Sequence, residues 1–115
     1  MSRDEESTPH RGEVWWIAFG PSVGGEIQKA RPAVIVSNDA ANRFLNRVQV
    51  IPITSNVGRL YPGEAHVTVN GVRHKAMADQ LTTASKGRLR DLMGKLTTNG
   101  VAAVERAIRV QLGLM

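Results

Sequence analysis

The fold of this chain is decided by the stretch Arg31-Pro32-Ala33-Val34-Ile35-Val36-Ser37-Asn38, in which a cation directly precedes an apolar run. Residues 33–36 are all apolar, so a strand formed by them has apolar side chains on both faces. This predicts a strand that is buried on both faces of a sheet. Proline lacks a backbone donor and fixes φ, so Pro32 is expected at the first residue of that strand. Arg31 is therefore expected at the rim of the sheet, positioned by rigid backbone and reachable by solvent. A merely solvated charge at a strand end is the alternative.

Length indicates one domain, and the composition is compatible with a reducing compartment. With 115 residues the chain can build one core, and we expect a flexible tail over residues 1–11 and a single domain over residues 12–115. The absence of cysteine excludes disulfides and thiolate zinc sites. No apolar run approaches the roughly 18 residues of a membrane span, and the first eight residues are acidic where a signal peptide is basic. We therefore expect a cytoplasmic protein without membrane contacts.

The charge balance predicts attraction to a polyanion. Fifteen Lys and Arg against ten Asp and Glu give a formal net charge of +5, and the basic excess is concentrated in the last third of the chain. A nucleic acid or an acidic protein segment would be attracted to such a surface. Charge alone does not separate binding from catalysis.

The segments before Arg31 predict a strand and a loop. Residues 13–19 are bulky on both faces, which predicts a first strand with Trp15 and Trp16 both buried; a stacking platform for bases is the alternative. Residues 20–30 form a Gly-rich loop, either a mobile flap over the rim or a plain long connection. The spacing of a phosphate-binding P-loop is absent from it.

A second buried strand is expected to carry hydroxyl groups to the edge of the sheet. It follows a short helical turn over residues 39–46 and ends in Thr54, Ser55 and an asparagine, while Pro52 argues for a bulge or an unpaired edge. Neighbouring antiparallel strands bring the start of one beside the end of the other. We therefore expect Thr54 and Ser55 to lie close to Arg31.

The middle of the chain predicts a hairpin followed by further strands. Residues 66–70 alternate polar with apolar like a half-exposed strand, and Asn70-Gly71 is a strong hairpin signal. We expect another strand over residues 76–83, carrying an acid and an amide at Asp79 and Gln80, and a last one over residues 88–96.

The C-terminal segment predicts a helix that covers the sheet. Thr97 is expected to cap a helix over residues 101–112, where apolar residues recur at helical spacing. With the strands described above, this indicates a mainly β fold, a small, curved, antiparallel barrel-like sheet with one C-terminal helix.

The side chains gathered at the rim suit a phosphodiester better than an acyl group. His10, His66 and His74 lack the spacing of metal ligands, and no G-x-S-x-G elbow is present, so we expect neither a metal nor another cofactor. Arginine presents a planar fork matched to phosphate, and a hydroxyl can donate to the charge that builds on its oxygens. If the substrate is RNA, its own 2′-OH can attack, and no protein nucleophile is needed.

The ordered combination of several segments resembles the MazF/PemK/Kid toxin endoribonucleases, of type II toxin–antitoxin systems. No single segment is specific, but all occur in the order of that family. They are residues 12–16 (GEVWW), 24–26 (GGE), 31–39 (RPAVIVSND), 42–44 (NRF), 50–55 (VIPITS), 78–81 (ADQL) and the ending LGL.

The resemblance implies an SH3-like barrel of the CcdB/PemK type, assembled as a homodimer in the bacterial cytoplasm. It implies metal-independent, sequence-specific cleavage of single-stranded RNA, whether messenger, ribosomal or transfer RNA, which inhibits translation and growth. It also implies a cognate antitoxin whose acidic, extended segment occupies the RNA groove. The net positive charge would favour both partners.

Carried over by position, the family's catalytic arginine falls on Arg31 and its catalytic threonine on Thr54. We expect Arg31 to clamp the scissile phosphate, and because an arginine is too basic to accept a proton, Glu26 is the candidate general base, with Asp79 behind it. The products would be a 2′,3′-cyclic phosphate and a 5′-hydroxyl. The candidate RNA contacts are Lys29, Asn38, Ser55, Asp79 and Gln80.

Two other functions remain as alternatives. The same barrel is similar to that of the CcdB-type toxins, which poison DNA gyrase by binding and cleave nothing. A non-catalytic RNA-binding barrel also fits the composition. Incubation with labelled RNA in chelator separates the nuclease from both alternatives. A gyrase supercoiling assay identifies a CcdB-type gyrase poison.

Overall fold

The structure, a computed structural model, describes residues 8–20 and 30–114 of the chain. Residues 1–7 of the predicted tail and most of the predicted flap lie outside the described residues. The elements in chain order are β1 (Glu13–Ala18), β2 (Ala30–Ile35), α2 (Asp39–Phe44), β3 (Arg47–Thr54), β4 (Glu64–Val69), β5 (Val72–Met77), the 3-10 turn η1 (Ala78–Gln80), β6 (Thr82–Ser85), the 3-10 turn η2 (Lys86–Arg88), β7 (Leu89–Lys95) and α3 (Thr98–Leu112).

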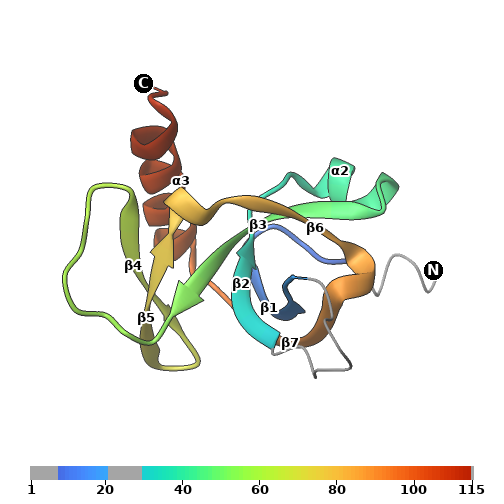
Figure 1. Ribbon diagram of the computed structural model, residues 1–115, viewed down its shortest axis with the longest axis horizontal. Helices are drawn as coiled ribbons and strands as arrows, with labels where there is room; N and C mark the ends of the chain where they lie inside the picture. The colour runs from blue at the N-terminus through green and yellow to red at the C-terminus, as the bar shows by residue number, and fades with distance from the viewer. Residues whose placement is uncertain (1–7, 21–29, 115) are drawn as a thin grey trace.

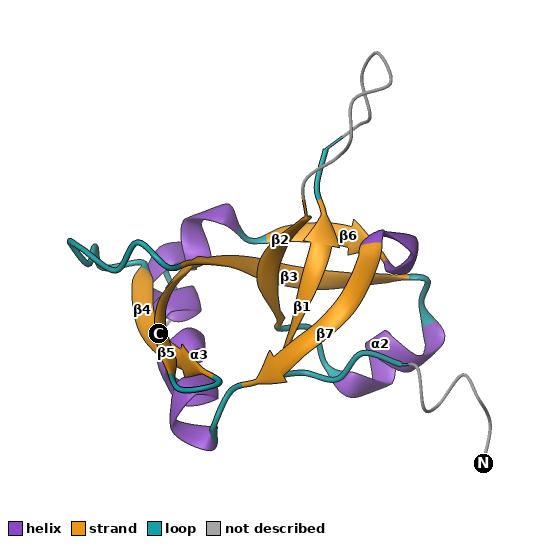
Figure 2. Cartoon of the chain, turned by 90° about the horizontal axis from the view of Figure 1, so that it is seen from below, coloured by secondary structure: helices purple, strands orange, loops and turns teal. Residues whose placement is uncertain are grey.

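The strands form one strongly curved antiparallel sheet, which confirms the predicted fold class. Its order is β4-β5-β3-β2-β1-β7, and β6 also pairs with β3. Strands β6, β3, β2, β1 and β7 curl into an open barrel, while β4 and β5 extend from the far end of β3 and are covered by α3 (Figures 1 and 2). The long strand β3 therefore joins the barrel to the hairpin.

Strand β2 is buried on both faces, as its apolar run predicts. Ala33 and Ile35 point into the core inside the curved sheet, and Val34 points into the second core, beneath α3. The strand begins at Ala30, two residues before the expected start at Pro32. Arg31 is exposed near the start of the strand, as expected.

The proline of β3 lies where the strand has a partner on one side only. Pro52 pairs with Ala33 of β2. On the other side of β3, pairing with β6 ends at Val50 and pairing with β5 begins at Ile53. The missing donor of Pro52 thus falls in an unpaired gap of the ladder, which accounts for a proline within a central strand.

Two expectations about the strands are wrong. Residues 76–83 do not form one strand, because the chain leaves β5 at Met77, makes the turn η1 and re-pairs with β3 as β6. Asp79 and Gln80 therefore lie on η1. The two tryptophans are also not both buried: Trp15 packs partly against the barrel core, whereas Trp16 is 37% exposed on the opposite face.

The hairpin and the C-terminal helix follow the predicted signals. Asn70 and Gly71 adopt φ values of 52° and 78°, the left-handed conformation that a two-residue hairpin turn requires. Thr97 caps α3 by accepting a hydrogen bond from the Gly100 N–H, and Gly113 ends the helix at φ 71°. In the described part of the chain, no helix is long and apolar enough to span a membrane.

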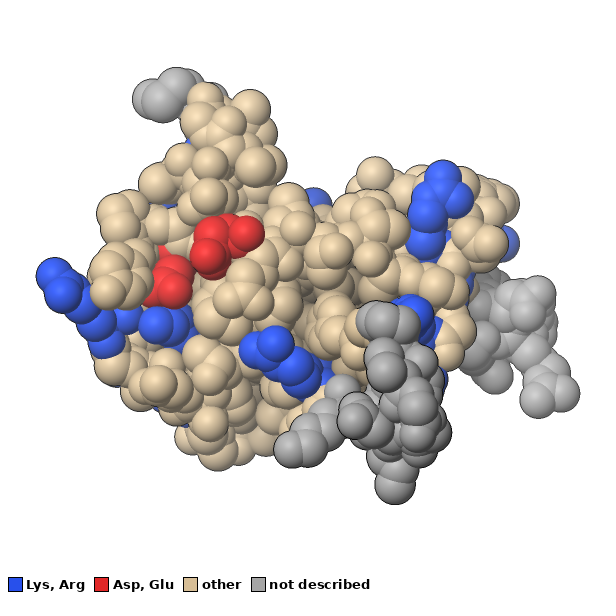
Figure 3. Space-filling model, viewed as in Figure 1, with Lys and Arg blue, Asp and Glu red and all other residues tan. Residues whose placement is uncertain are grey.

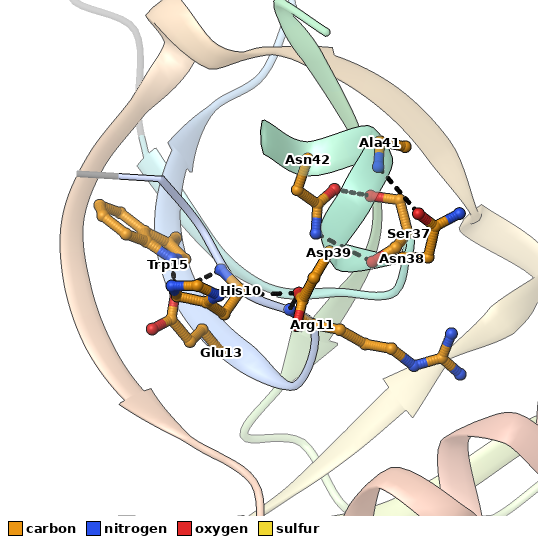
Figure 4. Close-up of polar contacts among 9 residues, drawn as sticks. All are labelled: His10, Arg11, Glu13, Trp15, Ser37, Asn38, Asp39, Ala41 and Asn42. Atoms are coloured by element: carbon orange, nitrogen blue, oxygen red, sulfur yellow. Dashed lines mark hydrogen bonds and ion pairs between the residues drawn. The ribbon is translucent and has the colours of Figure 1, made fainter. Parts of the chain in front are cut away.

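A buried amide fastens the short helix α2 to the barrel (Figure 4). The side chain of Asn42 is fully buried, where its amide donates to the Ser37 carbonyl at 2.9 Å and its oxygen accepts from the Ser37 hydroxyl. That hydroxyl in turn accepts from the Gln49 N–H of β3 at 3.0 Å. Asn38 caps the same helix by accepting from the Ala41 N–H at 2.8 Å.

Replacing this amide is expected to destabilise the domain. Asn42→Ala should lower the free energy of unfolding by about 2 kcal/mol, because it removes a fully buried side chain and leaves the half-buried Ser37 carbonyl without its amide donor. Chemical denaturation checks this. Asn46→Ala, a change at an exposed asparagine just beyond α2, should shift stability by less than about 0.5 kcal/mol. Equal stability of the two variants would contradict this role of Asn42.

Candidate functional site

Arg31 and Thr54 are brought together by the pairing of β2 with β3. The ladder pairs Ala33 with Pro52 and Val34 with Ile51. Continuing this antiparallel register by two residues places Arg31 opposite Thr54, and directly opposed residues have Cβ atoms about 5 Å apart on the same face of a sheet. The start of β2 and the end of β3 therefore lie at the same rim of the sheet, as predicted.

The same row of residues continues across two more strands. Thr54 pairs with Lys75 of β5, and Lys75 pairs with His66 of β4. Because directly paired residues share a face, Arg31, Thr54, Lys75 and His66 form a polar row across four adjacent strands. The opposite face of the β4–β5 hairpin carries the apolar residues that pack beneath α3.

The cation of this row is available to a ligand. Arg31 is exposed, and its guanidinium forms no ion pair or hydrogen bond with any other described residue. The described part of the chain thus leaves all five N–H donors of its planar fork unused, and such a fork is the arrangement that binds phosphate oxygens.

The Thr54 hydroxyl is oriented by its own backbone. Its oxygen accepts a hydrogen bond from the Asn56 N–H at 3.1 Å, and this contact leaves the hydroxyl hydrogen for donation to another group. Ser55, the next residue, is exposed at the same strand end. A phosphate beside Arg31 would therefore meet hydroxyl donors on the neighbouring strand.

The loop between β3 and β4 is fastened to the polar row by a half-buried ion pair. The ammonium of Lys75 lies 3.3 Å from the Glu64 carboxylate and donates to the Arg59 carbonyl at 3.0 Å, with both charged side chains only 12% exposed. Glu64 also accepts from the Tyr61 N–H at 2.8 Å. These contacts hold both halves of the loop against the sheet, directly beyond Thr54.

Asp79 and Gln80 approach the row from the gap in the ladder. The turn η1 that carries them bridges the positions of β3 left unpaired beside Pro52, and it contacts both β3 and α3. Asp79 is exposed and forms no ion pair or side-chain hydrogen bond with the other described residues, whereas the Gln80 amide lies 3.5 Å from the Met77 sulfur.

The remaining predicted site residues are not part of this arrangement. Asn38 follows the opposite end of β2, on the order of 20 Å along the chain from Arg31, and its side chain is used as the cap of α2. Glu26 and Lys29 lie outside the described residues.

The charges around the row are mixed in sign. The exposed Arg31, Arg59 and Arg73 lie near its ends, and Lys75 lies within it. Figure 3 shows acidic side chains gathered below the C-terminal helix, with basic side chains on either side of them. The surface thus carries separate acidic and basic patches on this face.

The sequence pattern alone did not identify Glu64, Tyr61 and Lys75 as part of the site. A signal was nevertheless available, because a two-residue turn at Asn70-Gly71 fixes the register of the hairpin and so aligns position 75 with 66 and position 77 with 64. The ion pair itself joins diagonal neighbours across that hairpin.

Comparison with known proteins gives a family and several relatives. Residues 10–112 match the family described as "PemK-like, MazF-like toxin of type II toxin-antitoxin system". The chain is 34% identical to "Endoribonuclease MazF9" of Mycobacterium tuberculosis over 113 residues, which cover 90% of this chain and 96% of that protein.

Solved structures of similar proteins cover nearly the whole chain. A mycobacterial endoribonuclease in complex with its cognate antitoxin has a TM-score of 0.77 at 28% identity and covers 93% of this chain and 97% of its own. A MazE-MazF structure from Deinococcus radiodurans has a TM-score of 0.79 at 26% identity, with 94% and 98% covered.

The half-buried ion pair makes a testable contribution to stability. Lys75→Met should lower the free energy of unfolding by about 2 kcal/mol, because it leaves the Glu64 carboxylate without its cation at a site largely shielded from water. The double variant Lys75→Met/Glu64→Gln should recover more than half of that loss. Arg73→Met, at an exposed cation on the same strand, should change stability by less than about 0.5 kcal/mol. Denaturation curves that give equal losses for the single and double variants would contradict this coupling.

Proposed function

The chain belongs to the family of PemK-like, MazF-like toxins of type II toxin–antitoxin systems, and from this premise we propose that it is an endoribonuclease toxin that cleaves single-stranded RNA. The observation that carries the proposal is the β2–β3 register, whose continuation by two residues brings Arg31 opposite Thr54. Arg31 has no side-chain partner among the described residues. Fold alone would not separate a nuclease from a binding protein. A free phosphate-binding cation beside an oriented hydroxyl supports the nuclease.

The proposed reaction is an attack by the RNA on itself. The 2′-oxygen forms a bond to the adjacent phosphorus, the bond from phosphorus to the 5′-oxygen breaks, and the products are a 2′,3′-cyclic phosphate and a 5′-hydroxyl. Arg31 binds the non-bridging oxygens, stabilises the charge that grows on them and donates a hydrogen bond to the leaving 5′-oxygen, which takes its proton from solvent water to become the 5′-hydroxyl. Thr54 donates its hydroxyl hydrogen to the same phosphate.

The 2′-hydroxyl must lose its proton to a group other than Arg31. A guanidinium remains protonated in proteins, so it supplies charge and donors but not a base. Glu26 is the proposed acceptor, carried over by its position in the family's motif. Asp79 is the second candidate, and its exposed carboxylate without a partner among the described residues supports that assignment.

The proposed partners follow from the family and the surface. Two of the similar structures contain a toxin with its antitoxin, and a net charge of +5 would attract the acidic, extended segment of such a partner. We expect a homodimer in the bacterial cytoplasm. The exposed apolar side chains of Val110, Leu112 and Leu114 at the end of α3 support an interface between copies.

Removal of the guanidinium should abolish most of the cleavage. Arg31→Ala should slow cutting of a long, partly unstructured RNA on the order of 10²–10⁴-fold, because the charge on the phosphate oxygens loses its main counter-charge. The wild type should cut at discrete sites with 5′-hydroxyl ends, and EDTA should leave its rate unchanged. Cleavage time courses with and without EDTA check the two rates, and mapping of the new ends checks the cut sites and their 5′ chemistry.

A matched control removes the same charge at the other end of the sheet. Arg47→Ala, at the start of β3, should keep cleavage within about threefold of the wild type, because only non-specific attraction is reduced. Cleavage by a folded Arg31→Ala protein at the rate of the Arg47→Ala protein would refute the role of Arg31. Intact RNA with all proteins folded would favour a binding protein, and gyrase would be tested next.

A further inference from the structure

The Thr54 hydroxyl lies at the end of a chain of hydrogen bonds that begins at a histidine of the β4–β5 hairpin. The Nε2 atom of His66 lies 3.3 Å from the Val57 carbonyl oxygen, and because a carbonyl only accepts, the imidazole donates. The Gly58 N–H belongs to the same peptide unit and donates to the Asn56 side-chain oxygen at 3.4 Å. The Asn56 N–H in turn donates to the Thr54 hydroxyl oxygen at 3.1 Å. One peptide unit and one asparagine thus connect His66 to the hydroxyl.

The register of the sheet places His66 for this contact. His66 pairs directly with Lys75, which pairs directly with Thr54. Its side chain therefore lies on the same face as that of Thr54, two strands away, at a distance on the order of 10 Å. The β3–β4 loop leaves the sheet at Thr54 and returns at the start of β4. An imidazole on this face can therefore reach the beginning of the loop.

The other contacts that hold this loop lie farther from Thr54 in the sequence. Lys75 and Glu64 bind the loop at Arg59 and at a residue that follows it. Among the described side chains of the hairpin, that of His66 binds the loop nearest to Thr54. The stretch that orients the hydroxyl thus depends on the imidazole rather than on the ion pair.

The position of the Asn56 N–H decides where the Thr54 hydroxyl hydrogen points. An N–H that is aimed at the oxygen occupies one of its acceptor directions, so the hydroxyl hydrogen turns to another. A loop that moves away releases this constraint, and the hydroxyl then rotates away from a phosphate beside Arg31 for part of the time. A directed donor contributes most in the transition state, where the charge on the phosphate oxygens is greatest. Holding the loop should therefore affect the rate of cleavage more than the affinity for RNA.

We propose that His66 is a positioning residue for RNA cleavage, which directs the Thr54 hydroxyl toward the scissile phosphate by holding the Val57–Gly58 peptide unit. The inference rests on the proposed ribonuclease function. His66 acts through the loop backbone and does not contact the phosphate itself. Because hydrogen bonds on the two sides of one peptide unit strengthen each other, loss of the imidazole also weakens the bond to Asn56.

The first test measures kcat and KM on an oligoribonucleotide that contains one mapped cut site. His66→Ala should lower kcat about tenfold, as expected for the loss of one hydrogen bond, and should leave KM within about threefold of the wild type. His66→Gln puts an amide N–H in the place of the Nε2–H and should restore kcat to within about threefold. Thermal unfolding verifies that each variant is folded.

His10→Ala is the matched control for the loss of an imidazole. His10 is exposed and lies 3.7 Å from the Asp39 carboxylate of α2, away from the loop. This variant should keep both kcat and KM within about threefold of the wild type. A His66→Ala protein that cuts as fast as the His10→Ala protein would overturn the proposal.

A Thr54→Val background separates positioning of the hydroxyl from general support of the fold. If His66 acts through the Thr54 hydroxyl, His66→Ala should slow the Thr54→Val protein by less than about twofold. A structural role would slow both backgrounds equally. Equal losses in the two backgrounds, or a loss confined to KM, would overturn the proposal.

Exchange of the Asn56 amide hydrogen measures the same contact without RNA. This amide should exchange about tenfold faster in His66→Ala than in the wild type, and at the wild-type rate in His10→Ala. An unchanged rate in His66→Ala would overturn the positioning role. A wild type that cuts no RNA would overturn the nuclease, whereas amide exchange would still decide whether His66 holds the loop. The two proposals therefore fail in different measurements.

Discussion

The pairing of β2 with β3 is the constraint on which the site depends. It buries Val34 and Ile51 beneath the helix and Ala33 and Val50 inside the barrel, so a shift by one residue would exchange the two faces. The same register sets Arg31 opposite Thr54 at the rim. The apolar contacts that stabilise the domain thus also position the Arg31 side chain at the rim.

The fold was largely predictable because its strongest signals are local. The apolar run after Arg31, the Asn70-Gly71 turn and the Thr97 cap each act through adjacent residues. The break at η1 was not predictable, because residues 76–83 have a continuous strand pattern and the interruption comes from β3, which exchanges one partner for another across Pro52. The exposure of Trp16 was not predicted, because the face of β1 opposite the barrel core is only partly covered at that position.

The candidate site likewise contains residues that the sequence predicted and residues that it did not. Arg31, Thr54 and Ser55 were predictable because strand ends meet in any antiparallel pair. Glu64 and Lys75 are joined diagonally across a hairpin, so a scan of spacing alone did not couple them, although the turn fixes their register. Their ion pair serves a different purpose from the rim, because it fastens the β3–β4 loop against the sheet.

The most direct test of a shared phosphate at Arg31 and Thr54 is a double-mutant cycle on the cleavage rate. Single-turnover rates would be measured for the wild type, Arg31→Ala, Thr54→Val and the double variant, with folding verified for each. Groups that act on one phosphate are strongly non-additive, so the double variant should be at most a few-fold slower than Arg31→Ala. Losses that multiply, as for independent sites, would contradict the meeting of these two residues in one active site.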